Sequence, residues 1–345
     1  MPRYAKAERV DSKSAGCGFV THSGYVNTYK VVDASPGAGG MLRGFLDSGR
    51  FSLSGYYAEV GSPEEETLAA NLPSFSGKMK CDVLVGSFYN PNLTDSQYYR
   101  NIMRELKPAI SLVEIPASLY SWYDPPGACF GYAHEWYVLD AVDYLVPQHR
   151  KRCWVVSIDR ELVGPNFKIG SPVPRNHPPT VRDAIGGLTL QPVVQSFNGP
   201  TYHAGKGMHI IVPTPKKNQV VYDCIPPGSS ADAIPAELRW KGRQGNIGSS
   251  DIYGRLMWNY PASEILPRLD PNKGRFIHPE WIDFKHEGNQ NRLISPLEAA
   301  RIQTFPDDYQ WFGNKAQVMR QIGEATPPAQ AMCFAHYIAD LLDNE

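Results

Sequence analysis

The sequence predicts an α/β protein, because short apolar runs alternate with helical patterns through its first half. A second observation is a change near residue 164, beyond which the chain is rich in Pro, Gly, Asn and Ser as far as about residue 290. The third is the return of helical patterns after residue 295. Together these features predict a parallel sheet with right-handed helical crossovers, interrupted by a mostly β insertion.

Five strand-like runs, separated by helical patterns, occupy the first half of the chain. We expect strands at Tyr29–Asp33, Leu53–Glu59, Cys81–Gly86, Ala109–Glu114 and Arg152–Ile158. The helical patterns lie at Met41–Ser48, 64–71, Ser96–Leu106 and Val138–Tyr144. A strand followed by a helix and then by another strand is the repeating unit of parallel sheets, so these runs predict one sheet.

The second half begins with the loop-rich region and ends in helices. Two short strand-like pieces, Met208–Val212 and Gln219–Ile225, lie in the loop-rich region. Ser295–Gln303 opens with Ser-Pro-Leu-Glu, a capping box with proline in the first turn, and therefore predicts a helix. Ala329–Leu342 is an amphipathic pattern preceded by two prolines, which predicts a final helix.

The composition is that of an ordinary globular protein, with 42% hydrophobic and 20% charged residues. No apolar run approaches the ~20 residues of a membrane span, and the polar start of the chain lacks the apolar core of a secretory signal. The six cysteines are scattered without a CxxC pair, so we expect reduced thiols, no metal site and a cytoplasmic protein, or a nuclear one in a eukaryote. The net charge of −1 neither favours nor excludes a nucleic-acid partner, because binding depends on local basic patches.

A glycine-rich turn follows the first expected strand. Asp33 ends that strand, and Gly37, Gly39 and Gly40 lie in the turn before the first expected helix. Glycines let the backbone approach a ligand closely, and ligands of open α/β sheets bind beyond the carboxyl ends of the strands. Glu59 ends the next strand, where an acidic side chain can accept both hydroxyls of a ribose. The pattern predicts a nucleoside site, although a turn without a ligand could carry the same glycines.

Six segments of the chain match the motifs of one enzyme family in the right order. They are Asp33–Gly40, Asp82–Phe88, Val113–Glu114, Pro147–Arg152, Arg292–Asp307 and Gln321–Pro328. On these segments, and most specifically on Arg292–Asp307, the chain resembles the DNA cytosine-C5 methyltransferases over nearly its whole length. The resemblance implies a class I S-adenosylmethionine-dependent methyltransferase fold with a Rossmann-like sheet. It also implies a catalytic domain made of residues 1–165 and 291–345, with an inserted, mostly β target-recognition domain at 166–290.

The resemblance further implies ligands and residue roles. The cofactor would be S-adenosylmethionine or a related nucleoside, and the partner would be double-stranded DNA with one base flipped into a pocket. The implied cofactor-binding residues are Asp33, Gly37, Gly39, Gly40, Glu59, Asp82 and Glu324. Glu114, Arg150 and Arg152 match catalytic motifs of the family. Each of these three could instead be structural, Glu114 as a buried carboxylate and the arginines as donors to loop carbonyls.

The family's chemistry requires a thiolate, and this chain departs from the pattern at that point. A cysteine thiolate adds to C6 of cytosine, because C5 is not nucleophilic until that adduct forms. Alignment of the Asp82 segment puts Tyr89 at the family's proline and Asn90 at its catalytic cysteine. A carboxamide cannot take this role. Cys81 lies at the opposite end of the expected strand, and Cys129 lies on a loop that could approach the pocket.

Further departures cluster in the same pocket. Ile115 and Pro116 replace the Asn-Val of the family's Glu-Asn-Val motif, and Ser35 replaces an aromatic residue near the cofactor. Glu324 replaces an asparagine close to the cofactor's amino-acid end, where it would repel the carboxylate of S-adenosylmethionine unless it were paired or protonated. An engineered change at Asn90 alone would not explain the others. Substitutions that spare the scaffold indicate a fold kept for something other than C5 methylation.

Polar side chains of the inserted region are the candidate DNA contacts. Contacts to phosphates or bases are expected from Lys241, Arg243, Arg255, Arg268, Lys273 and Arg275. Gln244 and Asn246 are candidate readers of base edges, and Gln148 is a further candidate DNA contact. Any one of the basic side chains could equally be a solvated surface charge.

Three functions fit these residues. In the first, the chain does no chemistry and is a DNA-binding regulatory subunit that pairs with an active methyltransferase or another member of a DNA modification system. The second is an enzyme with altered chemistry, or a different donor, acting on a flipped pyrimidine. For this function Asn90-Pro91-Asn92-Leu93 faintly resembles the motif of amino-group methyltransferases. The third, a conventional C5 methyltransferase with an unrecognised nucleophile, is the least favoured on chemical grounds.

Overall fold

The structure of the chain is a computed structural model. It describes residues 28–75, 78–89, 93–119, 131–163, 169–175, 177–188, 193–194, 202–203, 208–211, 214–239, 254–267, 276–280, 282–283 and 289–344.

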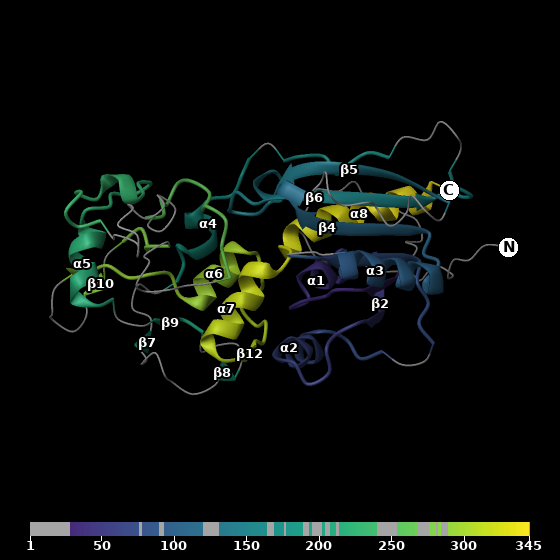
Figure 1. The fold of residues 1–345 in the computed structure, drawn as a ribbon, viewed down its shortest axis with the longest axis horizontal. Coiled ribbons are helices and arrows are strands. Elements are labelled where there is room, and N and C mark those ends of the chain that lie inside the picture. The colour runs from purple at the N-terminus through teal and green to yellow at the C-terminus, as the bar shows by residue number, and fades with distance from the viewer. Residues whose placement is uncertain are drawn as a thin grey trace.

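A six-stranded sheet forms the centre of one lobe of the molecule (Figure 1). In spatial order its strands are β2 (Phe51–Tyr56), β1 (Tyr29–Asp33), β3 (Val83–Ser87), β4 (Ile110–Pro116), β6 (Lys151–Asp159) and β5 (Tyr132–Asp140). The first four strands run parallel, whereas β6 is antiparallel to both of its neighbours. The predicted α/β sheet is confirmed, but it is mixed rather than wholly parallel.

Eight α-helices lie within the described residues. They are α1 (Gly40–Asp47), α2 (Pro63–Asn71), α3 (Leu93–Leu106), α4 (Val181–Ile185), α5 (Lys216–Asp223), α6 (Pro296–Ile302), α7 (Lys315–Glu324) and α8 (Pro328–Asp343). Short strands complete the described elements: β7 (Val193–Val194), β8 (Tyr202–His203), β9 (Ile210–Ile211), β10 (Ile282–Asp283), β11 (Asn289–Gln290) and β12 (Phe312–Gly313).

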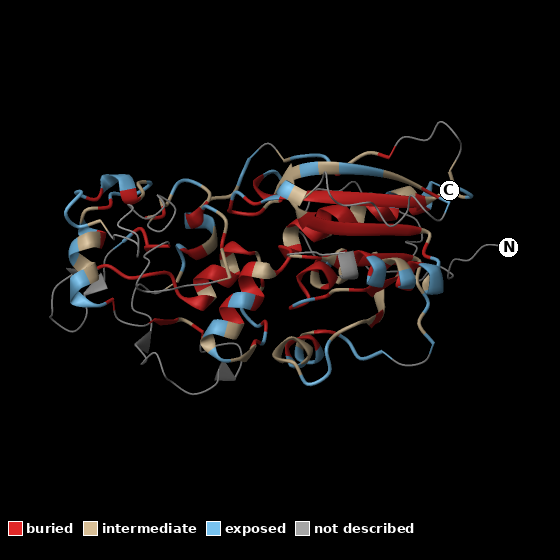
Figure 2. Cartoon of the chain, viewed as in Figure 1, coloured by how far each residue is buried: buried red, intermediate tan, exposed pale blue. Residues whose placement is uncertain are grey.

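Successive strand residues supply hydrophobic cores on opposite faces of the sheet, as the two-residue period of a strand requires. Val31 of β1 packs in one core with Phe45 of α1 and Phe334 of α8. The next residue, Val32, packs in a second core with Tyr99 of α3. The inner strands are therefore buried on both faces, whereas the edge strand β5 is largely exposed or partly exposed (Figure 2).

The second lobe joins the inserted region to helices that follow it in the sequence (Figure 1). One hydrophobic core contains Val181 of α4 and Phe276 together with Ile302 of α6 and Ile322 of α7. Of the C-terminal helices, α8 packs on the sheet and α6 and α7 share a core with the insertion. The domain boundaries at 165/166 and 290/291 stay a prediction.

Two predicted elements are wrong, and two helices, α4 and α7, were not predicted. Residues 138–140 end strand β5 and only Ala141–Tyr144 form a short 3-10 turn, because Tyr132–Asp140 is rich in the aromatic and branched residues that suit strands. Gln219–Ile225, predicted as a strand, lies mostly in helix α5, which buries Tyr222 on one side. Helix α7 begins at an Asn314 capping box that the sequence analysis missed.

Candidate functional site

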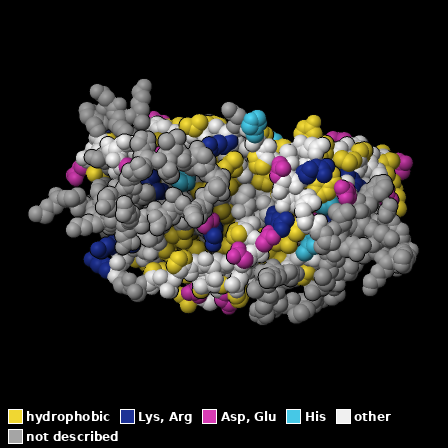
Figure 3. Space-filling model, turned by 180° about the vertical axis from the view of Figure 1, so that it is seen from behind, with side chains coloured by type: hydrophobic (Ala, Val, Ile, Leu, Met, Phe, Trp, Pro, Cys, Tyr) yellow, Lys and Arg dark blue, Asp and Glu magenta, His cyan; other side chains and the backbone are white. Residues whose placement is uncertain are grey.

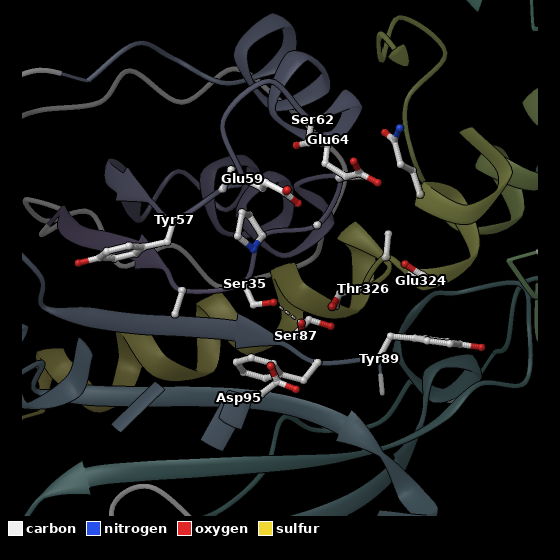
Figure 4. Close-up of a pocket in the computed structure, with 18 of the residues that line it drawn as sticks. Ser35, Tyr57, Glu59, Ser62, Glu64, Ser87, Tyr89, Asp95, Glu324 and Thr326 are labelled. Atoms are coloured by element: carbon white, nitrogen blue, oxygen red, sulfur yellow. Dashed lines mark hydrogen bonds between the residues drawn. The ribbon is translucent and has the colours of Figure 1, made fainter. Parts of the chain in front are cut away.

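A pocket of about 580 Å³ opens at the carboxyl ends of β1, β2 and β3. Figure 4 shows Ser35 in the middle, Glu59, Ser62 and Glu64 on one side, and Ser87, Tyr89 and Asp95 on the other. Its lining residues are Ala34, Ser35, Pro36, Gly37, Ala38, Tyr57, Ala58, Glu59, Ser62, Glu64, Ser87, Phe88, Tyr89, Asp95, Tyr98, Arg320, Gln321, Glu324, Ala325 and Thr326. This volume is in the range of small-molecule sites, which is about 300–1,000 Å³.

The turn after β1 forms the floor of the pocket. Its shape is held by Ser35, whose backbone N–H donates to Asp33 Oδ1 at 2.9 Å and whose hydroxyl donates to the Ser87 carbonyl at 2.9 Å. Gly37 has a φ of 51°, and a Cβ there would meet nothing within 4 Å, so its backbone faces open space. Of the three predicted glycines, Gly37 is the one that lines the pocket.

Asp33, Gly39 and Gly40 shape the turn from behind rather than line the pocket. Asp33 is fully buried, and this burial raises the pKa of its carboxyl to about 7 despite the hydrogen bond from the Ser35 backbone. Gly39 precedes α1 with a φ of 86°. A Cβ on Gly40 would lie 2.0 Å from the Thr326 carbonyl oxygen, so glycine lets the chain before α8 pack against α1. These three residues do not line the pocket, and their role in binding a cofactor stays a prediction.

Acidic side chains dominate the charged lining of the pocket. Glu59 follows β2, Glu64 lies in the first turn of α2, and Glu324 ends α7. The one basic side chain among the described lining residues is Arg320, whose Nη2 lies 2.6 Å from Glu64 Oε1. The pKa of the Glu324 carboxyl is raised, mainly by burial. The charge of Arg320 opposes this rise, and the charge of Glu64 adds to it.

The sequence analysis missed several lining residues that come from different elements. They are Tyr57, Ser62, Glu64, Asp95, Tyr98 and Arg320. Ser62 could have been found as the N-cap of a helix. Its side chain caps α2 by accepting from the Glu65 backbone N–H at 3.1 Å. The approach of α3 and α7 to the same pocket depends on packing between distant segments, and nothing local in the sequence indicates it.

Asp82, a predicted cofactor ligand, does not line the pocket. It precedes β3, at the amino end of the strand, whereas the pocket lies beyond the carboxyl end. Its Oδ2 accepts a hydrogen bond from the Lys30 backbone N–H at 2.7 Å. Asp82 therefore ties the starts of β1 and β3 together.

Beneath the pocket, Glu114 lies in a buried cluster of polar and charged groups. Only 1% of its surface is exposed. Its Oε2 accepts hydrogen bonds from Ser87 Oγ, at 2.9 Å, and from Thr326 Oγ1. Its Oε1 lies 3.6 Å from Arg152 Nε and 3.9 Å from Arg150 Nε. The carboxylate is thus surrounded by groups of the protein itself.

The two motif arginines are also held by internal partners. Arg150 donates to the carbonyl oxygens of Gly323 at 2.9 Å and Glu324 at 3.3 Å, and burial lowers its pKa to about 10. Arg152 donates to Glu264 Oε1 at 2.5 Å. Its guanidinium carbon lies 5.9 Å from the centre of the Tyr89 ring. Glu264, from the inserted region, thereby links the second lobe to the sheet.

Two predicted DNA contacts are buried structural residues. Gln148 donates to Gln303 Oε1 at 2.7 Å and accepts from the Ile265 backbone N–H at 2.9 Å, with no exposed surface. Arg255 is 5% exposed and donates to the backbone carbonyls of Ile225 at 2.6 Å and Tyr222 at 2.9 Å. Both side chains hold loops together, because a buried polar group must find partners inside the protein.

The other proposed contacts lie outside the described residues. They are Asn90, Cys129, Lys241, Arg243, Gln244, Asn246, Arg268, Lys273 and Arg275. On the face seen in Figure 3, the described Lys and Arg side chains lie among acidic ones and form no continuous basic patch. None of the described helices is long and apolar enough to cross a membrane.

The mixed sheet, with its reversed strand next to the edge and its ligand-sized pocket at the parallel strand ends, is the class I methyltransferase fold. The model of the C-5 cytosine-specific DNA methylase family matches residues 128–339, and the chain belongs to that family.

Relatives and solved structures agree with this assignment. The chain is 29% identical over 266 residues to the type II methylase M.HgiDII of Herpetosiphon aurantiacus, covering 71% of this chain and 69% of the relative. It is 25% identical over 360 residues to the type II methyltransferase M.Eco47II of Escherichia coli, covering 92% and 80%.

Among solved structures, a prophage-encoded E. coli protein described as a DNA modification methyltransferase superimposes with a TM-score of 0.68 at 18% identity, covering 91% of this chain and 99% of that one. Spodoptera frugiperda DNMT2 follows with a TM-score of 0.57 at 12% identity, covering 90% and 99%. These two likenesses support the fold.

Proposed function

We propose that this protein binds double-stranded DNA and a nucleoside ligand but has lost ordinary C5 methylation. It would act as a regulatory or partner subunit of a DNA modification system. The single observation that carries the proposal is the contrast between two sites. The nucleoside pocket is open, with Gly37 and Glu59 in its lining, whereas Glu114 beneath it is 1% exposed and already bonded to Ser87 and Thr326.

The nucleophile of the ordinary reaction is missing at the position where the family pattern puts it. Asn90 stands at the cysteine of the motif, and a carboxamide is not a nucleophile for C6 of cytosine. The described cysteines offer no substitute, because none lines the pocket. Burial raises the pKa of Cys81 and raises that of Cys153 to about 11, so both favour the unreactive thiol at neutral pH.

The nucleoside half of S-adenosylmethionine fits the pocket. Gly37 leaves its backbone open to a ligand, and Glu59 follows β2, where a carboxylate can accept both ribose hydroxyls. Pro36 and the aromatic side chains of Tyr57 and Phe88 supply apolar surface for a base. When bound, the cofactor would supply an electrophilic methyl group. The amino-acid half fits less well, because Glu324 lies where it would meet the cofactor's carboxylate.

The DNA partner is proposed from family membership and from the relatives, which include proteins named as DNA (cytosine-5)-methyltransferases. Lys241, Arg243 and Arg275 are the proposed basic contacts, since they lie in the inserted region that would face a duplex. A duplex-binding measurement over a range of salt concentrations tests this, because affinity carried by phosphate contacts falls steeply with salt.

A covalent trap tests the loss of C5 chemistry directly. Duplex DNA containing 5-fluorocytosine is incubated with the protein and S-adenosylmethionine, and a denaturing gel reports any covalent complex. We expect no complex with the wild-type chain, together with duplex binding in a parallel fluorescence-anisotropy titration. Active M.Eco47II, a relative of this chain, serves as the positive control. A covalent complex with the wild-type chain would overturn the proposal.

A second candidate function is an enzyme that uses altered chemistry or a different donor on a flipped pyrimidine. The open pocket is compatible with it, because group transfer from a nucleoside donor requires a site of this kind. Mass spectrometry of nucleosides from cells that express the protein separates the two functions. A new modified nucleoside would establish the enzyme, and an unmodified profile with duplex binding retained would favour the regulatory subunit.

A further inference from the structure

The charged lining of the nucleoside pocket is strongly one-sided. Among the described lining residues, four carry carboxylates: Glu59, Glu64, Asp95 and Glu324. The opposing guanidinium is that of Arg320, and it is already paired with Glu64 at 2.6 Å. A ligand that enters this pocket therefore meets an excess of negative charge.

Glu59 and Glu324 bound different parts of this space (Figure 4). Glu59 follows β2, where it can hold a ribose, and its negative charge is matched to hydroxyl donors. Glu324 ends α7 and lines the pocket at a distance from Glu59, so a tail that ran from a ribose at Glu59 towards α7 would meet it. The two carboxylates thus have separate tasks.

The position of Glu324 sets the charge that such a tail can carry. Arg150 donates to the backbone carbonyl of Glu324 at 3.3 Å, but its charge is shared with the carboxylates of Glu114 and Glu264. Among the described lining residues, Arg320 is the one basic side chain that a tail carboxylate beside Glu324 could pair with, and the carboxylate would have to displace Glu64 from it. A sulfonium or ammonium group could instead approach Glu59 or Glu324 without breaking the pair between Glu64 and Arg320.

We infer that this pocket prefers a nucleoside whose 5′ tail is cationic and carries no carboxylate, in the manner of decarboxylated S-adenosylmethionine, over S-adenosylmethionine and S-adenosylhomocysteine. The inference rests on the proposed nucleoside site and names its ligand class. It is consistent with the raised pKa of the Glu324 carboxyl, because a cation bound beside it would restore the ionised form.

Calorimetry with the full chain tests the preference. The probes are decarboxylated S-adenosylmethionine, S-adenosylmethionine, S-adenosylhomocysteine and adenosine, which has no charged tail. We expect decarboxylated S-adenosylmethionine to bind roughly tenfold or more tighter than S-adenosylmethionine, with S-adenosylhomocysteine weaker still. Equal affinities, or tighter binding of S-adenosylmethionine, would overturn the inference.

Two variants assign the preference to the pocket. Glu324→Gln keeps the size of the side chain but removes its charge. It should bring the affinities for decarboxylated S-adenosylmethionine and S-adenosylmethionine to within about threefold of each other. Glu66→Gln removes an exposed carboxylate from the same helix as Glu64, outside the pocket, and should leave the wild-type ratio unchanged. If Glu324→Gln left the ratio unchanged, or Glu66→Gln altered it as much, the assignment to Glu324 would be wrong.

Adenosine separates failure of this inference from failure of the proposed function. If none of the four probes binds at millimolar concentration, the nucleoside site itself is wrong, and this inference falls with it. If adenosine binds and the tail charge makes no difference, the nucleoside site stands and only the ligand class proposed here is overturned.

Discussion

Replacing Glu298 by Gln should destabilise the protein far more than replacing Asp307, another carboxylate paired with an arginine, by Asn. Glu298 and Arg292 form a two-pronged ion pair, with both N–O distances 2.7 Å and both side chains 1% exposed. Glu298 Oε2 also accepts from the Ser295 backbone N–H at 2.7 Å, which closes the capping box of α6. Glutamine keeps the shape but leaves the Arg292 charge buried without its anion.

The size of the effect follows from burial. Removing one partner of a buried ion pair costs about 3–5 kcal/mol, because the remaining charge stays desolvated. The nearby His278 cannot replace the lost anion, because an imidazole is neutral or cationic, and burial lowers its pKa to about 4 so that it stays neutral. Asp307 provides a matched control. It pairs with Arg301 at 2.5 Å, but the two side chains are 57% and 24% exposed, so Asp307→Asn should cost less than about 1 kcal/mol.

Urea unfolding of the three proteins measures both costs. Fluorescence and circular dichroism are recorded together, because coincident curves justify a single free energy of unfolding. Burial alone would raise the pKa of Glu298, but the hydrogen bonds and charge of Arg292 hold it below its usual value of 4.5. The ion pair therefore contributes fully above about pH 4.5 and is lost as the pH falls through the lowered pKa. A Glu298→Gln cost no larger than that of Asp307→Asn at pH 7 would refute the reasoning.

Three further changes test other parts of the structure. Gly40→Ala should cost at least about 2 kcal/mol in the same urea assay, because its Cβ would lie 2.0 Å from the Thr326 carbonyl oxygen, while Gly187→Ala, with nothing within 4 Å, should cost much less. The Asp33→Asn variant should gain stability relative to wild type, by up to roughly 4 kcal/mol, as the pH rises from about 4 to 7. The reason is that burial raises the pKa of Asp33 in the folded protein from 3.8 to about 7, so ionisation over this range destabilises the wild type. A stability difference independent of pH would contradict this. Glu264→Gln should lower the thermal midpoint by the equivalent of about 2 kcal/mol, since it removes the carboxylate shared by two arginines, and an unchanged midpoint would show that this contact is not needed.

Much of the sheet and the helices α6 and α8 could be predicted, because their signals are local. Strand β1 has the bounds expected from its apolar run, Tyr29–Asp33. The Ser295 capping box was visible in the sequence, and the structure contains both of its hydrogen bonds. By contrast, Gln219–Ile225 alternates enough to suggest a strand, but most of it is helical, and Tyr222 packs there in a core with Ile277 and Leu293. Tertiary packing overrides a weak local preference there.

The sequence by itself determined most strands of the sheet and the helices between them, the glycine turn with Glu59, and the asparagine at the family's cysteine position, because each depends on residue types close together in the chain. Only the tertiary structure decided which residues meet. It buried Gln148 and Arg255, moved Asp82 to the opposite end of the sheet from the pocket, and brought Glu324 into the same acidic pocket as Glu59. Hydrogen bonds of Arg255, Asp82 and Gln148 join residues that lie between 30 and 155 positions apart, and their geometry is set by packing rather than by spacing along the chain.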